Sequence, residues 1–339
     1  MKRTLAILAL LIVCFVLFAS GEVEDANKIP IKVLILPKFE IGEFENDTAG
    51  EAQAYYLRYL KGGDEYDIPG GIEGNKLYVK DGIALYITGI GKMQAALSVM
   101  AVLNDSRFDF SNAYILSTGC AGSAVETTVM GDVFVLSSII DFDLGHHADA
   151  RELSDPEGTT WFHDDAYDNS SIIRLNPSLV EKVYALVKDT HVETTPKTKA
   201  FMADAFDNAS WATRDPRVML GTTATGDNYW KGYYNHKNAL LMVQTYNCPD
   251  PFVTTEMEEI AVAFTVRRMG LIDRFISIRS SVNMDVFMNG DTPESLWSDA
   301  NDLSKNGGNK ETADIFDTTL NNVFKVGSII IDSILDGTI

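Results

Sequence analysis

Short apolar runs, each ending at a glycine or a polar turn and several followed by helical spacing, constrain this 339-residue chain most strongly. Runs of this length are typical of buried strands, and the segments between them carry helical periodicity. We expect strands at residues 31–36, 76–79, 83–87, 113–117, 133–140, 218–222, 241–245 and 274–278. We expect helices at residues 51–60, 91–103, 177–189, 255–269 and 312–335. This alternation predicts an α/β fold, a three-layer α/β/α sandwich around a mixed, largely parallel sheet.

The first 21 residues are typical of a secretion signal. Two basic residues precede an apolar run at 5–18, and the small residues at 19–21 suit a signal-peptidase cut. The run is shorter than the roughly 20 residues of a spanning helix. We therefore expect residues 22–339 to be secreted, extracellular or periplasmic, as a single domain that meets the membrane only through this signal.

The charge balance excludes one class of partner. Asp and Glu outnumber Lys and Arg by 48 to 28, and the cations form no stripe, so nucleic acid is not an expected partner. The long polar stretch at 141–173 is expected to be an insertion over one rim. It holds His146, His147, Asp149 and Arg151. Neighbouring residues point apart on a helix or a strand, so we expect no metal site there.

Residues 254–261, Thr-Thr-Glu-Met-Glu-Glu-Ile-Ala, place carboxylates at the start of an expected helix. Met257, Ile260, Ala261 and Phe264 follow helical spacing and predict a buried stripe beside Glu258. Two interpretations are open. The acids cap the helix and suit its dipole, or Glu258 is a buried carboxylate that binds a polyol such as ribose.

Three other turns follow apolar runs in a fixed order. They are Gly89-Ile90-Gly91-Lys92, the segment Ser-Thr-Gly-Cys-Ala-Gly at 117–122, and the segment Arg-Ser-Ser-Val-Asn-Met-Asp at 279–285. Open α/β sheets bind ligands at such strand ends, because backbone N–H groups and helix N-termini point into the crevice. One such turn predicts little, but their ordered combination indicates a ligand site.

With Gly131-Asp132, Thr225-Gly226-Asp227 and Glu256-Met257-Glu258 in the same order, the chain from about residue 31 to 278 resembles the nucleoside phosphorylase/nucleosidase superfamily. Within it, the chain resembles the purine nucleoside permeases. The resemblance implies cleavage of the N-glycosidic bond of a purine nucleoside, a small molecule, without a cofactor but with inorganic phosphate as a possible co-substrate. A chain that crosses a membrane at most once cannot enclose a transport path, so the name permease is not a physical inference.

The sugar side of the site is assigned first. Cleavage develops positive charge on the ribose, and a carboxylate accepts two hydrogen bonds from its hydroxyls while stabilising that charge. Glu258 is the expected ribose ligand. By resemblance, Met257 packs against the sugar, although ordinary core packing explains a methionine there equally well. Gly119 and Cys120 are expected in the same substrate pocket.

Two residues compete for the base. By resemblance, Asn283 takes the strand-end position that contacts the purine ring, where its amide both donates and accepts. Asp285 is the alternative, as a general acid. Tyr229 and Trp230 match the part of the family that stacks on the base, although an aromatic pair after a turn is otherwise commonly core.

The nucleophile pocket decides the reaction. Related phosphorylases usually hold phosphate with an arginine at the place that Ser117 takes here. Glu40 and Glu43 follow the first strand, near the water-activating glutamate of the related nucleosidases. Glu43 is the expected general base, with Ser117, Cys120 and Lys38 around the pocket. The alternative is that Lys38, Glu40 and Glu43 form a solvated loop.

Phosphorolysis stays open beside hydrolysis. Gly89, Gly91 and Lys92 offer amides and a cation for phosphate, and a neighbouring subunit of an expected homo-oligomer would supply the missing arginine. Three arginines of this chain lie outside the alignable regions: Arg151, Arg214 and Arg217. A third hypothesis is a nucleoside-binding or uptake protein without turnover. Cys120 and Cys248 remain after the signal, and two residues alone do not establish a disulfide.

Overall fold

The computed structural model describes residues 28–45, 47–148, 160–292 and 310–339, with side chains in the last helix from residue 314. The expected signal at 1–21 lies outside the described residues. So do Asp149 and Arg151 of the polar stretch.

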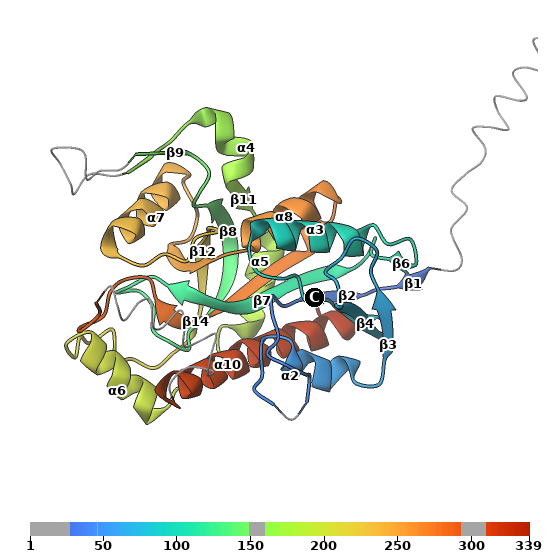
Figure 1. The fold of residues 1–339 in the computed structure, drawn as a ribbon, viewed down its shortest axis with the longest axis horizontal. Coiled ribbons are helices and arrows are strands. Elements are labelled where there is room, and N and C mark those ends of the chain that lie inside the picture. Colours follow the sequence, from blue (N-terminus) through green and yellow to red (C-terminus); the bar gives the residue numbers. More distant parts are fainter. Residues whose placement is uncertain (1–27, 46, 149–159, 293–309) are drawn as a thin grey trace, which may run out of the picture.

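One mixed sheet of ten strands forms the centre of the molecule (Figure 1). Nine strands follow each other in the order β11-β8-β12-β13-β7-β2-β5-β4-β3, and β14 pairs with both β7 and β8. Strands β8, β12, β13, β7 and β14 therefore form a closed ring, in which each strand pairs with the next and β14 pairs with β8. The bounds are β2 (Val33–Leu36), β3 (Asp64–Asp67), β4 (Lys76–Lys80), β5 (Ile83–Leu85), β7 (Tyr114–Ser123), β8 (Val133–Asp141), β11 (Ile172–Arg174), β12 (Val218–Thr225), β13 (Phe252–Glu256) and β14 (Phe275–Met284).

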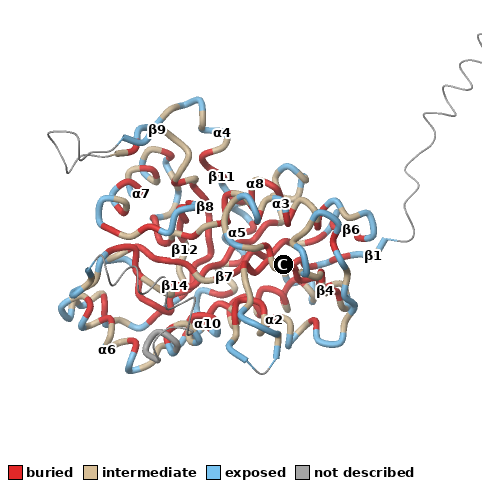
Figure 2. Tube along the Cα trace, viewed as in Figure 1, coloured by how far each residue is buried: buried red, intermediate tan, exposed pale blue. Residues whose placement is uncertain are grey.

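Helices cover both faces of this sheet, as Figure 1 shows. On one side α3 (Lys92–Leu103) packs against α8 (Glu259–Arg268), and on the other α10 (Lys310–Leu335) lies along β7 and β14 and contacts α2 (Gln53–Tyr55). The remaining helices of more than four residues are α5 (Pro177–Val187), α6 (Pro196–Ala205), α7 (Tyr233–Thr245) and the π-helix Tyr56–Leu60. Figure 2 shows the strands as the most buried part of the chain. The expected three-layer α/β/α architecture is confirmed.

Two segments form another type of element than expected. Residues 241–245 end helix α7 and form no strand, because a five-residue apolar run fits a half-buried helix as well as a strand. Strand β13 was not expected, since its last residues, Thr254, Thr255 and Glu256, have the composition of a helix start. The following helix consequently begins at Glu259.

The buried face of α8 also differs from the expected stripe. Met257 precedes the helix, and Ala261 and Phe264 are only half-buried. Ile260 is buried as expected, and Val262, Ala263 and Val266 are buried in addition. The physical reason is that α8 lies between the sheet and α3 and so buries more than one face.

The described parts of the polar stretch at 141–173 form small elements at one end of the molecule (Figure 1). Strands β9 (His146–His147) and β10 (Trp161–Phe162) pair with each other, and α4 (Asp168–Ser171) leads into β11. Strand β11 joins the sheet edge beside β8. The last residues of the polar stretch, 172–173, are therefore part of the central sheet and not of an insertion over its rim.

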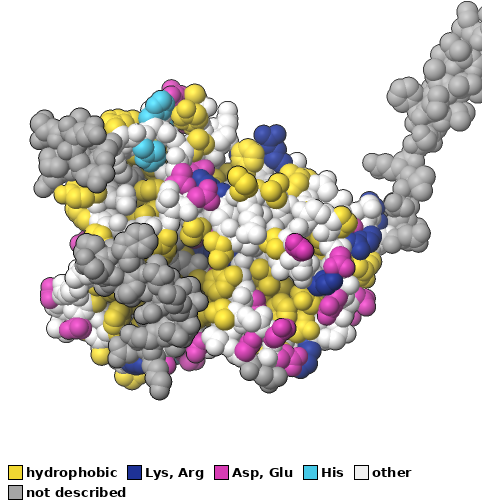
Figure 3. All heavy atoms as spheres, viewed as in Figure 1, with side chains coloured by type: hydrophobic (Ala, Val, Ile, Leu, Met, Phe, Trp, Pro, Cys, Tyr) yellow, Lys and Arg dark blue, Asp and Glu magenta, His cyan; other side chains and the backbone are white. Residues whose placement is uncertain are grey.

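Surface charge on the face drawn in Figure 3 is mixed. Lys and Arg side chains lie singly among Asp and Glu there and form no basic patch among the coloured residues. Within the described ranges, no helix has both the length and the apolar character needed to cross a membrane.

Candidate active site

Glu256, the last residue of β13, caps helix α8. Its Oε2 accepts hydrogen bonds from the backbone N–H groups of Glu258 (2.8 Å) and Glu259 (2.6 Å). Its Oε1 accepts from the Thr225 hydroxyl at 2.5 Å. A carboxylate at a helix N-terminus satisfies amides that lack an intrahelical partner and suits the helix dipole. The capping role therefore belongs to Glu256, which leaves Glu258 and Glu259 for other partners.

Arg279 in β14 is the centre of a buried charge cluster and is 1% exposed. Its Nη2 lies 2.6 Å from Glu259 Oε2, 3.4 Å from Glu256 Oε2 and 3.5 Å from Glu258 Oε2. Its Nη1 donates to the carbonyl of Cys120 at 3.2 Å. From the sequence, Arg279 was expected only as the start of a motif. A charged residue inside an apolar strand is the signal that could have identified it.

Lys38 follows β2 and is 2% exposed. Its Nζ donates to Ser117 Oγ (2.6 Å) and to the carbonyl of Leu36 (2.9 Å), and lies 3.7 Å from Glu259 Oε2. Ser117 Oγ in turn donates to Glu259 Oε2 at 2.9 Å. The structure thus brings Lys38 and Ser117 together as expected, and the expectation of a solvated loop is wrong for Lys38.

Glu51 takes the place expected for Glu43. Glu51 is buried, and its two oxygens accept from the N–H groups of Lys38 (2.7 Å) and Cys120 (2.8 Å). A Cβ at Gly119 would lie 2.5 Å from Glu51 Oε1, so the glycine makes room for this carboxylate. Glu43 is exposed and Glu40 accepts from loop amides, including that of Gln53 at 2.6 Å. The sequence placed Glu51 in a helix start and gave no other signal.

The glycine loop before α3 is already engaged with carboxylates. Gly89 and Gly91 have φ of 81° and 89°, which favours glycine. The N–H of Gly91 donates to Glu258 Oε1 at 3.2 Å, and that of Lys92 donates to Asp227 Oδ1 at 2.7 Å. The Gly91 and Lys92 amides therefore face acidic side chains, whereas the Gly89 N–H donates to the Lys38 carbonyl at 3.0 Å.

Lys92 Nζ lies 2.9 Å from both Asp141 Oδ1 and Asp143 Oδ2, and 4.0 Å from Asp227 Oδ2. Burial alone would lower the pKa of Lys92, but Asp141 and Asp143 outweigh it and raise the pKa above its ordinary value. Lys92 is therefore charged and paired with three carboxylates.

Asn283 and Asp285, the two candidates for contact with the base, lie in different surroundings. Asn283 is half-buried and pairs with Gly122 of β7, and Gly122 also pairs with Thr255, three residues before Glu258. Asp285 is fully buried, and its Oδ2 lies 2.7 Å from His236 Nδ1. Asn283 thus lies at the strand end that carries the charge cluster, whereas Asp285 is engaged with α7.

Of the two expected stacking residues, Tyr229 is 64% exposed and Trp230 is 7% exposed. The Trp230 ring stacks on Phe142, with centroids 4.8 Å apart, inside a hydrophobic cluster. Trp230 is a core residue, so its expected role in stacking on the base is wrong. Met257 is half-buried between β13 and α8.

Burial sets the pKa of two groups in the site. Burial raises the pKa of Glu258 to about 7, although Arg279 opposes this, and Glu256 adds to the rise. Burial also raises the pKa of the Cys120 thiol, and Glu51 adds to that rise. Cys120 is therefore a neutral thiol, and Cys120 and Cys248 are free cysteines.

Two other groups are structural. The Arg214 guanidinium binds buried Asp132 and the carbonyl of Thr127, which fixes the Gly131-Asp132 turn. Arg217 donates its N–H to the same Asp132 at 2.8 Å. The Arg214 guanidinium and the Arg217 amide therefore hold this turn.

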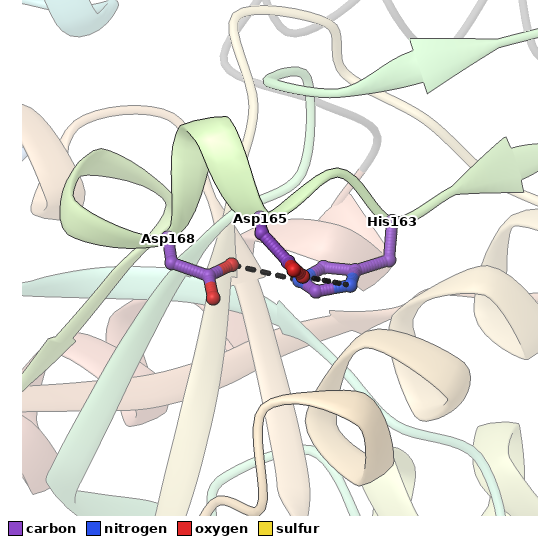
Figure 4. Close-up of side chains that lie close together, drawn as sticks. All are labelled: His163, Asp165 and Asp168. Atoms are coloured by element: carbon purple, nitrogen blue, oxygen red, sulfur yellow. Dashed lines mark hydrogen bonds and ion pairs between the residues drawn. The ribbon is translucent and has the colours of Figure 1, made fainter.

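Figure 4 shows His163, Asp165 and Asp168 close together near α4. His163 Nε2 lies 2.7 Å from Asp168 Oδ1, and Nδ1 lies 3.4 Å from Asp165 Oδ1. Each ring nitrogen thus faces its own carboxylate, which is the geometry of ion pairs. His146 pairs similarly with Asp164 at 3.0 Å.

The sequence matches a known protein family over almost all of the described chain. Residues 30–338 match the family model described as purine nucleoside permease (NUP). The chain belongs to this family. It is 30% identical over 222 residues to a probable purine nucleoside permease of Schizosaccharomyces pombe, a match that covers 58% of this chain and 63% of that relative. The resemblance stated from the sequence is confirmed.

Solved structures show that this member of the family has a nucleosidase-like fold. The 5'-methylthioadenosine/S-adenosylhomocysteine nucleosidase of Neisseria meningitidis has a TM-score of 0.52 and 16% identity, covering 89% of this chain and 99% of the other. The corresponding nucleosidase of S. pneumoniae has a TM-score of 0.53 and 16% identity, with 90% and 98% covered. A futalosine hydrolase mutant of Helicobacter pylori has a TM-score of 0.51 and 18% identity, with 89% and 99% covered.

Proposed function

We propose that this chain hydrolyses the N-glycosidic bond of purine nucleosides and releases the free base. The observation that carries the proposal is the buried cluster at the carboxyl end of β7, formed by Lys38, Glu51, Glu256, Glu258, Glu259 and Arg279. Its four carboxylates exceed its two cations. A site with excess negative charge stabilises a sugar that becomes positive as its bond to the base breaks.

Glu258 is the proposed ribose ligand. Its Oε1 faces the glycine loop and its Oε2 faces Arg279, which fixes the carboxylate beside the strand ends. The ionised form accepts hydrogen bonds from two ribose hydroxyls and lies close to the developing charge. Asn283, at the adjacent strand end, is the proposed contact to the purine ring.

Glu51 is the proposed general base in place of Glu43. Two backbone amides hold its carboxylate, and each oxygen keeps a further lone pair for a water molecule. In the proposed step the water oxygen bonds to the anomeric carbon while its proton passes to Glu51. The C–N bond breaks, the departing base takes up a proton from solvent, and Glu51 returns the water's proton to solvent, so the products are ribose and the neutral base.

Hydrolysis is favoured over phosphorolysis by the state of the anion-binding groups. Lys38 and Arg279 are paired with Glu259, Lys92 is paired with three aspartates, and the Gly91 amide is bonded to Glu258. Phosphate would have to displace carboxylates that belong to the chain. A neutral water molecule meets no such barrier.

The test is incubation of the mature chain with inosine, adenosine, guanosine and uridine, with and without phosphate, followed by separation of base, ribose and ribose 1-phosphate. Equal base release in both buffers, with free ribose, supports hydrolysis. Ribose 1-phosphate would refute it.

The second candidate is a nucleoside-binding protein for uptake, without turnover. The family description and the named relative favour it. The same incubation separates the two, because a carrier binds inosine in calorimetry and yields no product. Secretion after removal of residues 1–21 and assembly as a homo-oligomer are part of both proposals.

A further inference from the structure

One carboxylate oxygen in the cluster is held by donors from three separate parts of the sheet. Glu259 Oε2 lies 2.6 Å from Arg279 Nη2, 2.9 Å from Ser117 Oγ and 3.7 Å from Lys38 Nζ. These donors come from β14, β7 and the turn after β2. Glu259 itself is fully buried. A guanidinium, an ammonium and a hydroxyl that converge on one oxygen form an anion cradle, here filled by a side chain.

We propose that Glu259 is a specificity-determining residue whose carboxylate is a built-in anion that excludes phosphate from the nucleophile pocket. The inference rests on the proposed N-glycosidic cleavage. In this inference, the Glu259 carboxylate determines that water, and not phosphate, reacts with the sugar.

The donor set of the cradle suits a phosphate as well as a carboxylate. Arginine, lysine and serine side chains all bind phosphate oxygens, and Arg279 Nε is buried with no hydrogen-bond partner among the described residues. If Glu259 were removed, both Lys38 and Arg279 would lose one carboxylate partner. Their N–H groups would then be available to another anion. The cradle therefore has the groups to hold phosphate once its own anion is removed.

Glu259 is held in its ionised form near neutral pH. Burial alone would raise its pKa, but Lys38 and Arg279 outweigh burial and hold the pKa well below the ordinary value. Protonation thus does not empty the cradle near neutral pH. Only substitution does so.

Two substitutions and one control test this role. Glu259→Gln keeps the shape and removes the charge, Glu259→Ser also makes space, and Glu259→Asp keeps the charge. Inorganic phosphate is titrated into each folded protein by calorimetry and thermal melting. We expect phosphate to bind Glu259→Gln or Glu259→Ser at least about tenfold more tightly than the wild type. The wild type and Glu259→Asp are expected to show no melting shift with phosphate.

Product analysis gives a second measurement. In a variant with bound phosphate, a phosphate oxygen bonds to the anomeric carbon, the C–N bond breaks, and the proton of HPO₄²⁻ goes to the base. Ribose 1-phosphate should appear with the variants and only free ribose with the wild type. The release of base by the wild type tests the proposed function separately from phosphate binding.

The inference is overturned if folded Glu259→Gln and Glu259→Ser both fail to bind phosphate, or if the wild type binds it. Should neither variant fold, the wild-type titration decides alone: phosphate binding overturns the inference and its absence supports it. If the wild type cleaves no nucleoside but the variants gain phosphate binding, the proposed function fails and the role of Glu259 in anion exclusion stands.

Discussion

At Arg279 in β14, groups from β7, β13 and α8 meet within hydrogen-bonding reach of one guanidinium. A buried charge is tolerated only when it is paired, and breaking such a pair leaves an uncompensated charge. The sequence gives a hint of this, since Arg279 stands between apolar and small residues of a strand. Neither its partner Glu259 nor Glu51, which accepts from the Cys120 N–H, could be identified, because nothing in the sequence shows which strands lie side by side.

Glu258→Gln should separate catalysis from stability. The amide keeps the shape and keeps an oxygen for the Gly91 N–H, but it loses the charge that stabilises the sugar cation. We expect kcat/KM to fall on the order of 10²-fold or more. The melting temperature should change by no more than about 2 °C. Steady-state kinetics and calorimetry check this, with exposed Glu43→Gln as the control. Normal kinetics in Glu258→Gln would contradict the assigned role.

The pH profile should report the ionisation of Glu258. Its pKa of about 7 implies that the active carboxylate form is lost at acidic pH, so kcat/KM should rise with pH and level off above about 8. The contribution of Glu258 to the free energy of unfolding should change in the opposite direction and fall as pH rises. The folded protein binds this proton more tightly than the unfolded chain, so this group's contribution falls as pH rises from about 4.5 to about 7. A flat rate profile between pH 5 and 8 argues against Glu258 as the titrating group.

Glu51 and Glu43 offer a direct comparison of two candidate bases. Glu51→Gln turns an NH₂ group toward one of two backbone donors, which costs about 1–3 kcal/mol, and removes the proton acceptor. We expect a loss in kcat on the order of 10²-fold while inosine still binds. Glu43→Gln should leave kcat and KM unchanged. The opposite pattern in paired kinetic and binding measurements would restore Glu43 as the base.

At the scale of elements, β13 and α8 form one unit joined by Glu256. The helix pattern in the sequence was detected, but its start was placed four residues too early, because Thr254 and Thr255 suit both a strand and a helix cap. The glycine turns were located well, since positive φ requires glycine at Gly89 and Gly91. Helix α7 was missed because its apolar end resembles a short strand.

Glu256→Ala should destabilise this unit. It frees the amides of Glu258 and Glu259 and removes one carboxylate from Arg279. We expect a loss of about 3–5 kcal/mol in the free energy of unfolding. Urea denaturation measures it, with exposed Glu181→Ala on α5 as the control. If both variants unfold at the same urea concentration, Glu256 does not fix the start of α8.

At the scale of the whole molecule, the site and the surface carry the same sign of charge. The chain has a formal net charge of −20, and the carboxylates around Lys92 and Arg279 outnumber the cations. Anionic substrates therefore meet repulsion during approach and find no unpaired cation in these two clusters. Uncharged nucleosides meet neither barrier.

Inosine should therefore be cleaved and inosine 5'-monophosphate should not. We expect kcat/KM for the nucleotide to be lower on the order of 10²-fold or more, because each like charge brought into a poorly solvated site costs several kcal/mol. Added salt should reduce only the part of the difference that arises during approach, since screening acts on exposed charges and little on buried ones. Rates for both substrates at low and high ionic strength measure the two parts. Equal cleavage of nucleoside and nucleotide would show that a phosphate finds a free cation in the site, which contradicts the pairing of Lys92, Lys38 and Arg279.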